Sequence, residues 1–297
     1  MKYANLHLHS VHSDGVYTPR ELCEMAKKMG YGGIALTDHD TVSGCADMKK
    51  AAEETGLEYI FGIETYGVEF GIKFHITGYD FDPTEKAMAE YLRTDSESAY
   101  IVTKGKFDAM VAAGYITDIT WQDVLDDSPK EAWFCNEQIF ASLVKRTELT
   151  QKDYWDFVGK FRSIKTDVKP TFTAYSAEKM IKTITGAGGV AILAHPNRWI
   201  PYLPELYKMG IRGVEYDHPD VCPESCRAAY EFAKEHNMYL SGGTDHTGRL
   251  ANFPWERGDT PGAKERAGDA YHCPLDTDVY SGITKEEFDA LKNRIYG

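Results

Sequence analysis

Residues 5 to 15 read NLHLHSVHSDG and place His7, His9, His12 and Asp14 close together. Imidazole nitrogens and carboxylate oxygens are the ligands that Zn, Mn and Fe take in proteins. His7 and His9 are two residues apart, so on a strand their side chains point to the same side. An HxH pair alone is also compatible with two hydrogen-bonded core histidines. The run indicates a metal site only if the rest of the chain supplies partners for it.

Further titratable residues follow other predicted strands. They are Asp38, His39, Glu64, His75, His195, His218, Asp245 and His246. The carboxyl ends of parallel strands meet at one face of an α/β barrel or sheet, where active sites form. We therefore expect these side chains to meet the HxH pair in one pocket. Without a metal, burying so many polar groups would cost on the order of several kcal/mol.

Strand-like and helix-like segments alternate in the two outer parts of the chain, which predicts a parallel sheet or barrel. Alternating or apolar runs predict strands at 3–10, 31–40, 57–70, 74–81, 190–196, 211–219 and 238–248. Helical patterns occupy 18–30, 47–56, 176–189, 203–210, 223–237 and 284–297. At the first helix, Thr18 suits the N-cap, Pro19 the first turn and Glu21 a capping box.

The alternation stops between residues 83 and 169, where the chain is mostly helix-like. We expect residues 1–82 and 170–297 to form one α/β barrel unit. Residues 83–169 then form an inserted helical subdomain.

The composition suits a globular protein, with 42% hydrophobic and 27% charged residues. A net charge of −13 argues against binding an extended nucleic-acid duplex through a basic surface. The N-terminal residues lack the pattern of a signal peptide, and no apolar run is long enough to span a membrane. The six cysteines form no CxxC motif and suggest reduced thiols. We expect a cytoplasmic location. The amino-acid sequence gives no indication of the oligomeric state.

Several segments together resemble the PHP (polymerase and histidinol phosphatase) family of metal-dependent phosphoesterases. They are HLHSVHSDG, LTDHDTVSG, GIE, FHITGYDFDP, AILAHP, GVEYDHP and SGGTDH, in the family's order. The long helical insertion resembles the TrpH-like branch of the family. The resemblance implies a distorted (β/α)7 barrel that holds up to three divalent metal ions. Nitrogen and oxygen ligands without a thiolate suit Mn, Fe and Zn alike. Mn is the expected metal, with Zn and Fe as alternatives.

The resemblance also assigns ligands. His7, His9 and Asp245 would bind the first ion, Glu64 would bridge the first and second, and His75 and His195 would complete the second. Asp14, His39 and His246 would hold the third. Asp38 would orient one of the ligand imidazoles.

The chain departs from the family pattern in two places. The family usually ends with Asp-x-His, whereas here Asp245 and His246 are adjacent, and adjacent residues of an extended chain point apart. Either the glycines around them re-aim the two side chains, or the third metal site is altered. Relatives often show a Gly-Arg-Pro-His run in the insertion, where this chain has WFCNEQIF, so a phosphate contact must come from elsewhere.

The resemblance implies phosphate-ester hydrolysis, in which metal-activated hydroxide attacks phosphorus. His218 is the candidate for a general acid or a phosphate contact, and Arg198 could clamp a phosphate. Alternatively, His218 is a structural histidine hydrogen-bonded to the backbone, and Arg198 is a solvent-exposed loop residue. Roles for His12, Arg249 and His272 stay open.

The expected partner is a small phosphorylated substrate. A cyclic sugar phosphate and a nucleotide phosphate are the leading classes, and histidinol phosphate is a third. Two further alternatives are an amidohydrolase-like hydrolase of a non-phosphate bond and a metal-bound module without activity.

Overall fold

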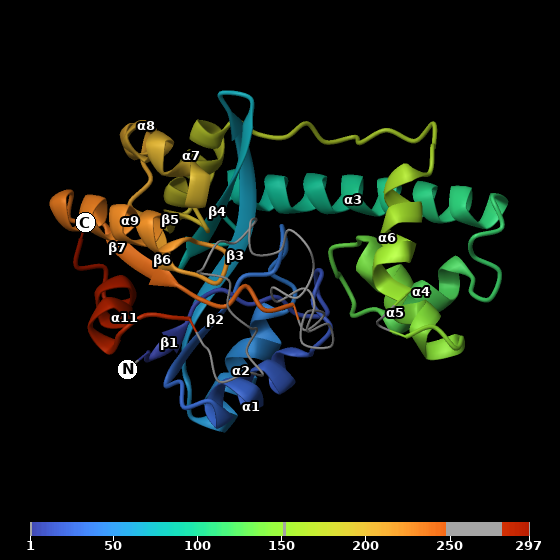
Figure 1. Cartoon of the computed structure of the whole chain (residues 1–297), viewed down its shortest axis with the longest axis horizontal. Helices are drawn as coiled ribbons and strands as arrows, with labels where there is room; N and C mark the ends of the chain where they lie inside the picture. The colour runs from blue at the N-terminus through green and yellow to red at the C-terminus, as the bar shows by residue number, and fades with distance from the viewer. Residues whose placement is uncertain (1, 151–152, 248–280, 297) are drawn as a thin grey trace.

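Seven strands form one sheet in the computed structural model, which describes residues 2–150, 153–247 and 281–296. The strands neighbour one another in chain order. They are β1 (Ala4–Asn5), β2 (Gly33–Leu36), β3 (Glu58–Glu69), β4 (Ile72–Tyr79), β5 (Val190–Leu193), β6 (Gly213–Asp217) and β7 (Tyr239–Gly242). Figure 1 shows helices around this sheet and a second group of helices set to one side.

The chain after β7 runs beside the chain after β1 and brings the two ends of the sheet together. The backbone N–H of Leu6 donates to Gly242, that of Asp245 to His7, and that of His9 to His246, at 2.9 to 3.1 Å. Leu8 and His246 form a parallel bridge. The sheet is therefore a nearly closed barrel, as predicted, and closure places the HxH segment beside Asp245.

β4 is antiparallel to both of its neighbours, which the expectation of parallel strands did not include. Phe70 and Gly71 join β3 to β4 with φ of 53° and 73°, the backbone of a tight hairpin turn. Since β4 runs backwards, its first half lies at the same barrel end as the carboxyl ends of the parallel strands. His75 reaches the pocket from the interior of β4 rather than from a strand end.

Helices cover the barrel in the expected alternation. They are α1 (Pro19–Lys28), α2 (Cys45–Thr55), α7 (Ala177–Gly186), α8 (Leu203–Met209), α9 (Pro223–Glu235), α11 (Lys285–Lys292) and the 3₁₀ helix η2 (Asn197–Tyr202). The predicted start of α1 is confirmed, because Thr18 and Glu21 form a capping box and Pro19 opens the helix. Each of these α-helices buries apolar side chains, as Leu22, Cys23 and Ala26 do in α1, whereas η2 has no fully buried residue.

Among the residues that the structure describes between β4 and α7, four α-helices occur, namely α3 (Lys86–Ala112), α4 (Trp121–Asp127), α5 (Asn136–Arg146) and α6 (Tyr154–Ser163). They share an apolar cluster that includes Phe107, Ile139 and Phe157. The beginning of α3 instead packs on the barrel, where Met88 and Tyr91 join the barrel's own cluster. Figure 1 shows α3 reaching from the barrel to the other three helices. The division at residues 83 and 169 stays a proposal.

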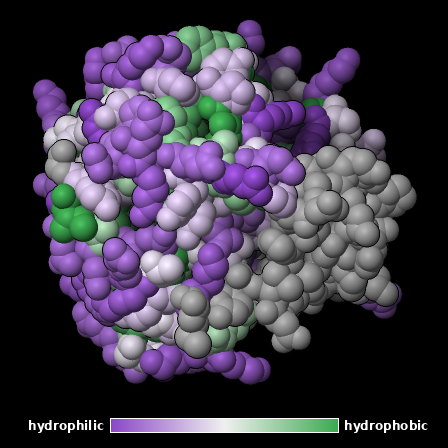
Figure 2. Space-filling view, turned by 60° about the vertical axis from the view of Figure 1, so that its left-hand side comes forward, coloured by the Kyte–Doolittle hydropathy of each residue, from purple (hydrophilic) through white to green (hydrophobic). Residues whose placement is uncertain are grey.

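The face shown in Figure 2 is mostly hydrophilic, with apolar side chains gathered in small patches. Across the described ranges, no helix combines the length and the apolar character needed to cross a membrane. Cys23, Cys45, Cys135, Cys222 and Cys226 are free thiols, whereas Cys273 lies outside the described residues.

Candidate metal centre

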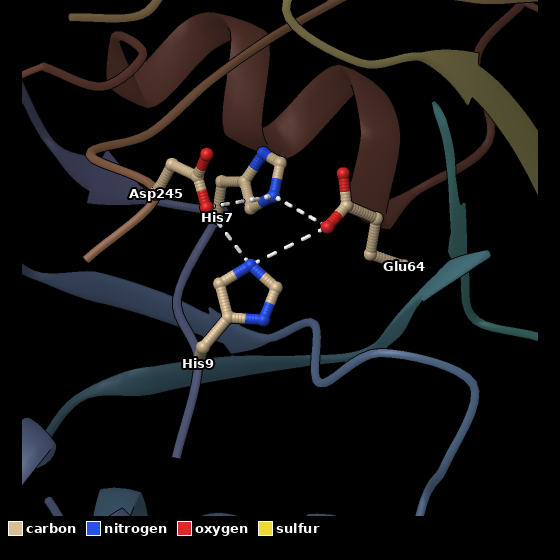
Figure 3. Close-up of side chains that lie close together, drawn as sticks. All are labelled: His7, His9, Glu64 and Asp245. Atoms are coloured by element: carbon tan, nitrogen blue, oxygen red, sulfur yellow. Dashed lines mark ion pairs between the residues drawn. The ribbon is translucent and has the colours of Figure 1, made fainter. Parts of the chain in front are cut away.

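Four buried or partly buried side chains meet where the barrel closes (Figure 3). Nε2 of His7 and Nε2 of His9 each lie 3.4 Å from one carboxylate oxygen of Glu64. The Asp245 carboxylate lies 2.9 Å from Nε2 of His9 and 3.6 Å from Nε2 of His7. This is the predicted ligand set for the first ion, drawn from segments that follow β1 and β7 and from the middle of β3.

The local backbone explains why the two strands can approach this closely. Leu6 and Leu8 alternate with the two histidines and are fully buried in apolar clusters. Gly243 lies against His7, and a Cβ on that glycine would come within 2.4 Å of the His7 backbone nitrogen. Only glycine permits this approach, which sets the distance between His7 and the Asp245 loop.

Glu64 also faces three histidines from other elements. Its Oε1 lies 3.0 Å from Nδ1 of His75 and 3.0 Å from Nε2 of His195. Its Oε2 lies 3.2 Å from Nδ1 of His39. A carboxylate that presents one oxygen to each of two histidine groups is arranged so that it could bridge two ions; the bridging role predicted for Glu64 stays a proposal.

A third group lies on the outer side of His9. The Asp14 carboxylate is 3.3 Å from Nδ1 of His9, and the rings of His9 and His39 are 4.6 Å apart between centroids. His9, Asp14 and His39 could together hold an ion. His39, His75 and His195 are about a quarter exposed, so this side of the centre is open to solvent.

His246, the remaining predicted ligand of the third ion, lies apart from that group. Its ring stacks on Tyr17, with centroids 5.6 Å apart and planes 10° apart. Asp245, with φ of 49°, turns into the centre instead. Among the groups of described residues that could hold an ion, Asp245 occurs and His246 does not. The assignment of His246 stays a proposal.

The charges of the centre oppose one another strongly. Burial would raise the pKa of Glu64, but the facing imidazoles, His7 first, hold that pKa well below its usual range. Burial would lower the pKa of His9, but the carboxylates of Asp14 and Asp245 raise it to about 9. For His39 burial wins and lowers the pKa to about 4. The carboxylates therefore stabilise positive charge between these side chains.

The donor set fits a divalent cation. Nε2 of His7 and both ring nitrogens of His9 are buried and have no hydrogen-bond partner. Buried polar atoms without partners are rare because each costs about 1–3 kcal/mol. Nitrogen and carboxylate-oxygen donors converging on one point are the ligands of Mn, Fe or Zn. The residues present thus suit the predicted metal.

Glu215 was missed in the sequence. Its carboxylate accepts from Nδ1 of His7 at 3.1 Å and from the backbone N–H of His195 at 2.7 Å. The proton on Nδ1 leaves the Nε2 lone pair of His7 free to face the centre. The available signal was a glutamate inside the short buried strand β6.

Asp38 forms hydrogen bonds to a loop, and its predicted role of orienting a ligand imidazole stays a proposal. Its carboxylate accepts from the Ser10 backbone N–H and hydroxyl, both at 2.7 Å, and from the Ser13 hydroxyl at 2.5 Å. Burial raises the pKa of Asp38 despite these bonds. Asp38 therefore positions the segment between His9 and Asp14.

His218 lies at the edge of the centre, with Nε2 3.4 Å from the Asp245 carboxylate. Its Nδ1 accepts from the backbone N–H of Asp220 at 3.0 Å. A ring nitrogen that accepts carries no proton, so neutral His218 carries its proton on Nε2. The imidazole therefore presents an N–H to the centre.

The other candidates lie elsewhere. Arg198 is exposed on η2, and its guanidinium stacks over Trp199 at 4.4 Å; within the described ranges it makes no contact with the centre. Nδ1 of His12 lies 2.9 Å from the Ser43 hydroxyl. Arg249 and His272 lie outside the described residues.

A family model described as the PHP domain matches residues 5–240. Three curated relatives cover most of the chain. A phosphoribosyl 1,2-cyclic phosphate 1,2-diphosphodiesterase of Eggerthella lenta is 27% identical over 84% of this chain and 96% of its own. A 3′,5′-nucleoside bisphosphate phosphatase of Chromobacterium violaceum is 28% identical, over 82% and 87%. A 5′-3′ exoribonuclease of Haemophilus influenzae is 30% identical, over 82% and 89%.

Solved structures are also similar over most of both chains. One of them, a crystal structure described as a metal-dependent phosphoesterase from Bifidobacterium adolescentis, is 28% identical, with a TM-score of 0.68. The similarity covers 84% of this chain and 88% of that one.

Proposed function

The chain belongs to the PHP-domain family, and on that premise we propose that it is a metal-dependent hydrolase of small phosphate esters. The observation that carries the proposal is Glu64, one buried carboxylate that faces five imidazoles at the open end of the barrel. The relatives from Eggerthella and Chromobacterium are named as enzymes that cleave phosphoric esters. Their similarity over most of the chain supports the same reaction class here.

We assign three divalent ions to the centre, Mn first, with Zn and Fe as alternatives. His7, His9 and Asp245 would hold one, His75 and His195 the second, and Asp14, His39 and His246 the third. Glu64 would bridge the first two. Bound divalent ions would neutralise the phosphoryl oxygens and lower the pKa of a bound water.

The residues of the chain have separable tasks around that centre. Glu215 fixes the tautomer of His7, and Asp38 holds the loop that carries Asp14. His218 presents an N–H from Nε2, which suits a hydrogen bond to a phosphate or leaving oxygen. Donation of that proton as a general acid would require the imidazolium form, in which Nδ1 is protonated and no longer accepts from Asp220. The guanidinium of Arg198 lies over the Trp199 ring, away from the centre. Arg198 could therefore bind a phosphate at the centre only after η2 moves.

A cyclic sugar phosphate is the first substrate class, since the relative covered over 96% of its length is named for such a compound. One observation favours a nucleotide phosphate as the second. The Trp133 ring lies 6.1 Å from the His39 ring, and its indole N–H donates to the buried Asp95 at 2.8 Å. An anchored indole beside the centre offers a face on which a base can stack.

Product analysis on a panel of substrates tests this proposal. The panel holds a ribose 1,2-cyclic phosphate, adenosine 3′,5′-bisphosphate, histidinol phosphate, an amide and a lactone. Each substrate is incubated with the Mn-loaded protein, and its products are followed by phosphate release and phosphorus NMR. We expect turnover of the cyclic ester or the bisphosphate. Turnover of only the amide or lactone would replace the proposal by the amidohydrolase-like alternative, and turnover of none would overturn it.

A further inference from the structure

The loop of residues 10–15 carries Asp14 to the centre and is held from two sides. On the barrel side, Asp38 binds Ser10 and Ser13, and the backbone N–H of Gly15 donates to Ser10. These bonds fix the side chains and one turn of the loop. They leave the carbonyl groups of residues 12 and 13 to be satisfied from elsewhere.

The helical insertion supplies those partners. The backbone N–H of Trp133 donates to the carbonyl of His12 at 2.8 Å. The side-chain amide of Gln138, which is 5% exposed, donates to the carbonyl of Ser13. The residue bonded by Gln138 directly precedes Asp14, so a shift of the Ser13 carbonyl moves the Asp14 backbone with it.

The amide of Gln138 has little freedom. Its oxygen accepts from the backbone N–H of Cys135 at 2.8 Å, which caps the beginning of α5. With the oxygen engaged there, the amide nitrogen is directed at Ser13. This side chain therefore joins the first turn of an insertion helix to the barrel loop that bears a candidate ligand, beside the Cys135 thiol, which lies 3.7 Å from the same Ser13 carbonyl.

We propose that Gln138 is a positioning residue of the metal centre, through which the insertion sets the place of Asp14. The inference rests on the proposed metal site and concerns ion binding rather than the choice of ester. Outer partners of metal ligands typically change metal affinity 10- to 100-fold when they are removed. Loss of the hydrogen bond from Gln138 to Ser13 should lower the affinity for the ion next to Asp14 by about that factor.

The two contacts of Gln138, one with Ser13 and one with Cys135 (its backbone N–H at 2.8 Å and its thiol at 3.2 Å), can be separated by substitution. Gln138→Glu keeps an oxygen for the Cys135 N–H, since glutamate also suits that capping position, but it cannot donate to Ser13 when ionised. Gln138→Met keeps the volume and removes both bonds. Gln122→Ala is a matched control, because Gln122 is an exposed glutamine of the same insertion and bonds only to Asp126 at 2.8 Å among the contacts described.

Titration of metal-free protein with Mn²⁺, followed by calorimetry and by electron paramagnetic resonance, measures the effect. We expect both Gln138 variants to lose roughly 10- to 100-fold in affinity for one ion and to keep the others, with the control unchanged. Asp14→Asn should weaken the same ion, and adding Gln138→Met to it should cause little further loss. Circular dichroism confirms that each variant is folded.

The inference would be overturned if the variants lost affinity for all ions equally or for none. It would also be overturned if Gln138→Met alone lowered the affinity, because Gln138 would then act only as a helix cap. Loss of ester cleavage plays no part in this readout. If the unaltered protein binds Mn²⁺ but cleaves no ester, the proposed function fails while this inference stands. If it cleaves esters and the variants bind ions normally, the reverse holds.

Discussion

At the level of single residues, carboxylates contact the histidines of the centre from two sides. Glu64 faces the ring nitrogens at the centre, whereas Glu215 binds Nδ1 of His7 and the backbone of His195 from behind. Removing the charge of Glu215 should therefore loosen two ligands at once.

We predict that Glu215→Gln lowers Mn²⁺ affinity about 10- to 100-fold, because the amide cannot accept both bonds with charged oxygens. Calorimetric titration of the metal-free protein measures this. Glu69→Gln, on the same barrel but near the β3–β4 turn, is the control. Unchanged affinity in Glu215→Gln would show that His7 needs no such partner.

His218→Asn should reduce turnover of an alkyl phosphate ester about 100- to 10,000-fold, which is the usual contribution of a general acid. Metal content should stay the same, and an ester with a nitrophenol leaving group should lose far less, since that group leaves without a proton. Steady-state kinetics on the two esters checks the prediction. Equal losses on both would assign His218 to substrate binding instead.

Most of the centre was predictable from residue types, because histidines and acidic residues clustered after the predicted strands. Glu215 was not, since it is one of 46 acidic residues and only its place inside a buried strand sets it apart. His246 shows the limit of a motif. Its neighbour Asp245, with a φ of 49°, turns into the centre, whereas the ring of His246 stacks on Tyr17.

At the level of elements, alternating strands and helices predicted the barrel but not the direction of β4. The run from 57 to 81 contains two strand patterns with only a short connection, and a parallel pair would need a crossover of a dozen or more residues. Phe70 and Gly71 supply the hairpin instead, which is why His75 reaches the pocket from mid-strand.

Glu58 links the beginning of β3 to α11, and its ionisation makes the free energy of unfolding depend on pH. Hydrogen bonds from Lys292 and Tyr3 lower the pKa of Glu58 to about 2, from 4.5 in the unfolded chain. A lowered pKa means that the stabilisation is complete above pH 4.5 and disappears as the pH falls towards 2. Because Glu58 is 37% exposed, solvent screening limits it to about 0.5–1 kcal/mol.

We predict that Glu58→Gln lowers the free energy of unfolding by this amount at pH 7 and by progressively less between pH 4.5 and pH 2. Urea denaturation at pH 7 and at pH 3 measures both values. Glu286→Gln, on α11, serves as the control. A deficit that stays constant with pH would refute the ion-pair explanation.

At the level of the whole molecule, an acidic chain of net charge −13 gathers imidazoles and carboxylates in the barrel's open end, where Nε2 of His7 and both ring nitrogens of His9 have no hydrogen-bond partner. A bound ion stabilises the folded state alone, by about 2.7 kcal/mol when its concentration is 100 times Kd. For a domain of this kind, that corresponds to a rise in Tm of roughly 5–10 °C.

We therefore expect treatment with a chelator to lower Tm by about this amount and Mn²⁺ to restore it. Differential scanning calorimetry measures the change, and Glu64→Gln should show a much smaller one. An equal Tm with and without metal would argue against a structural contribution of the ions.

The most direct test of the Glu64-centred site is the metal content per chain of Mn-loaded protein, determined by elemental analysis beside that of Glu64→Gln. Since Glu64 faces all five central histidines, we expect close to three ions on the unaltered chain and at most one on the variant. No bound ion on the unaltered chain, or the same number on both proteins, would contradict it.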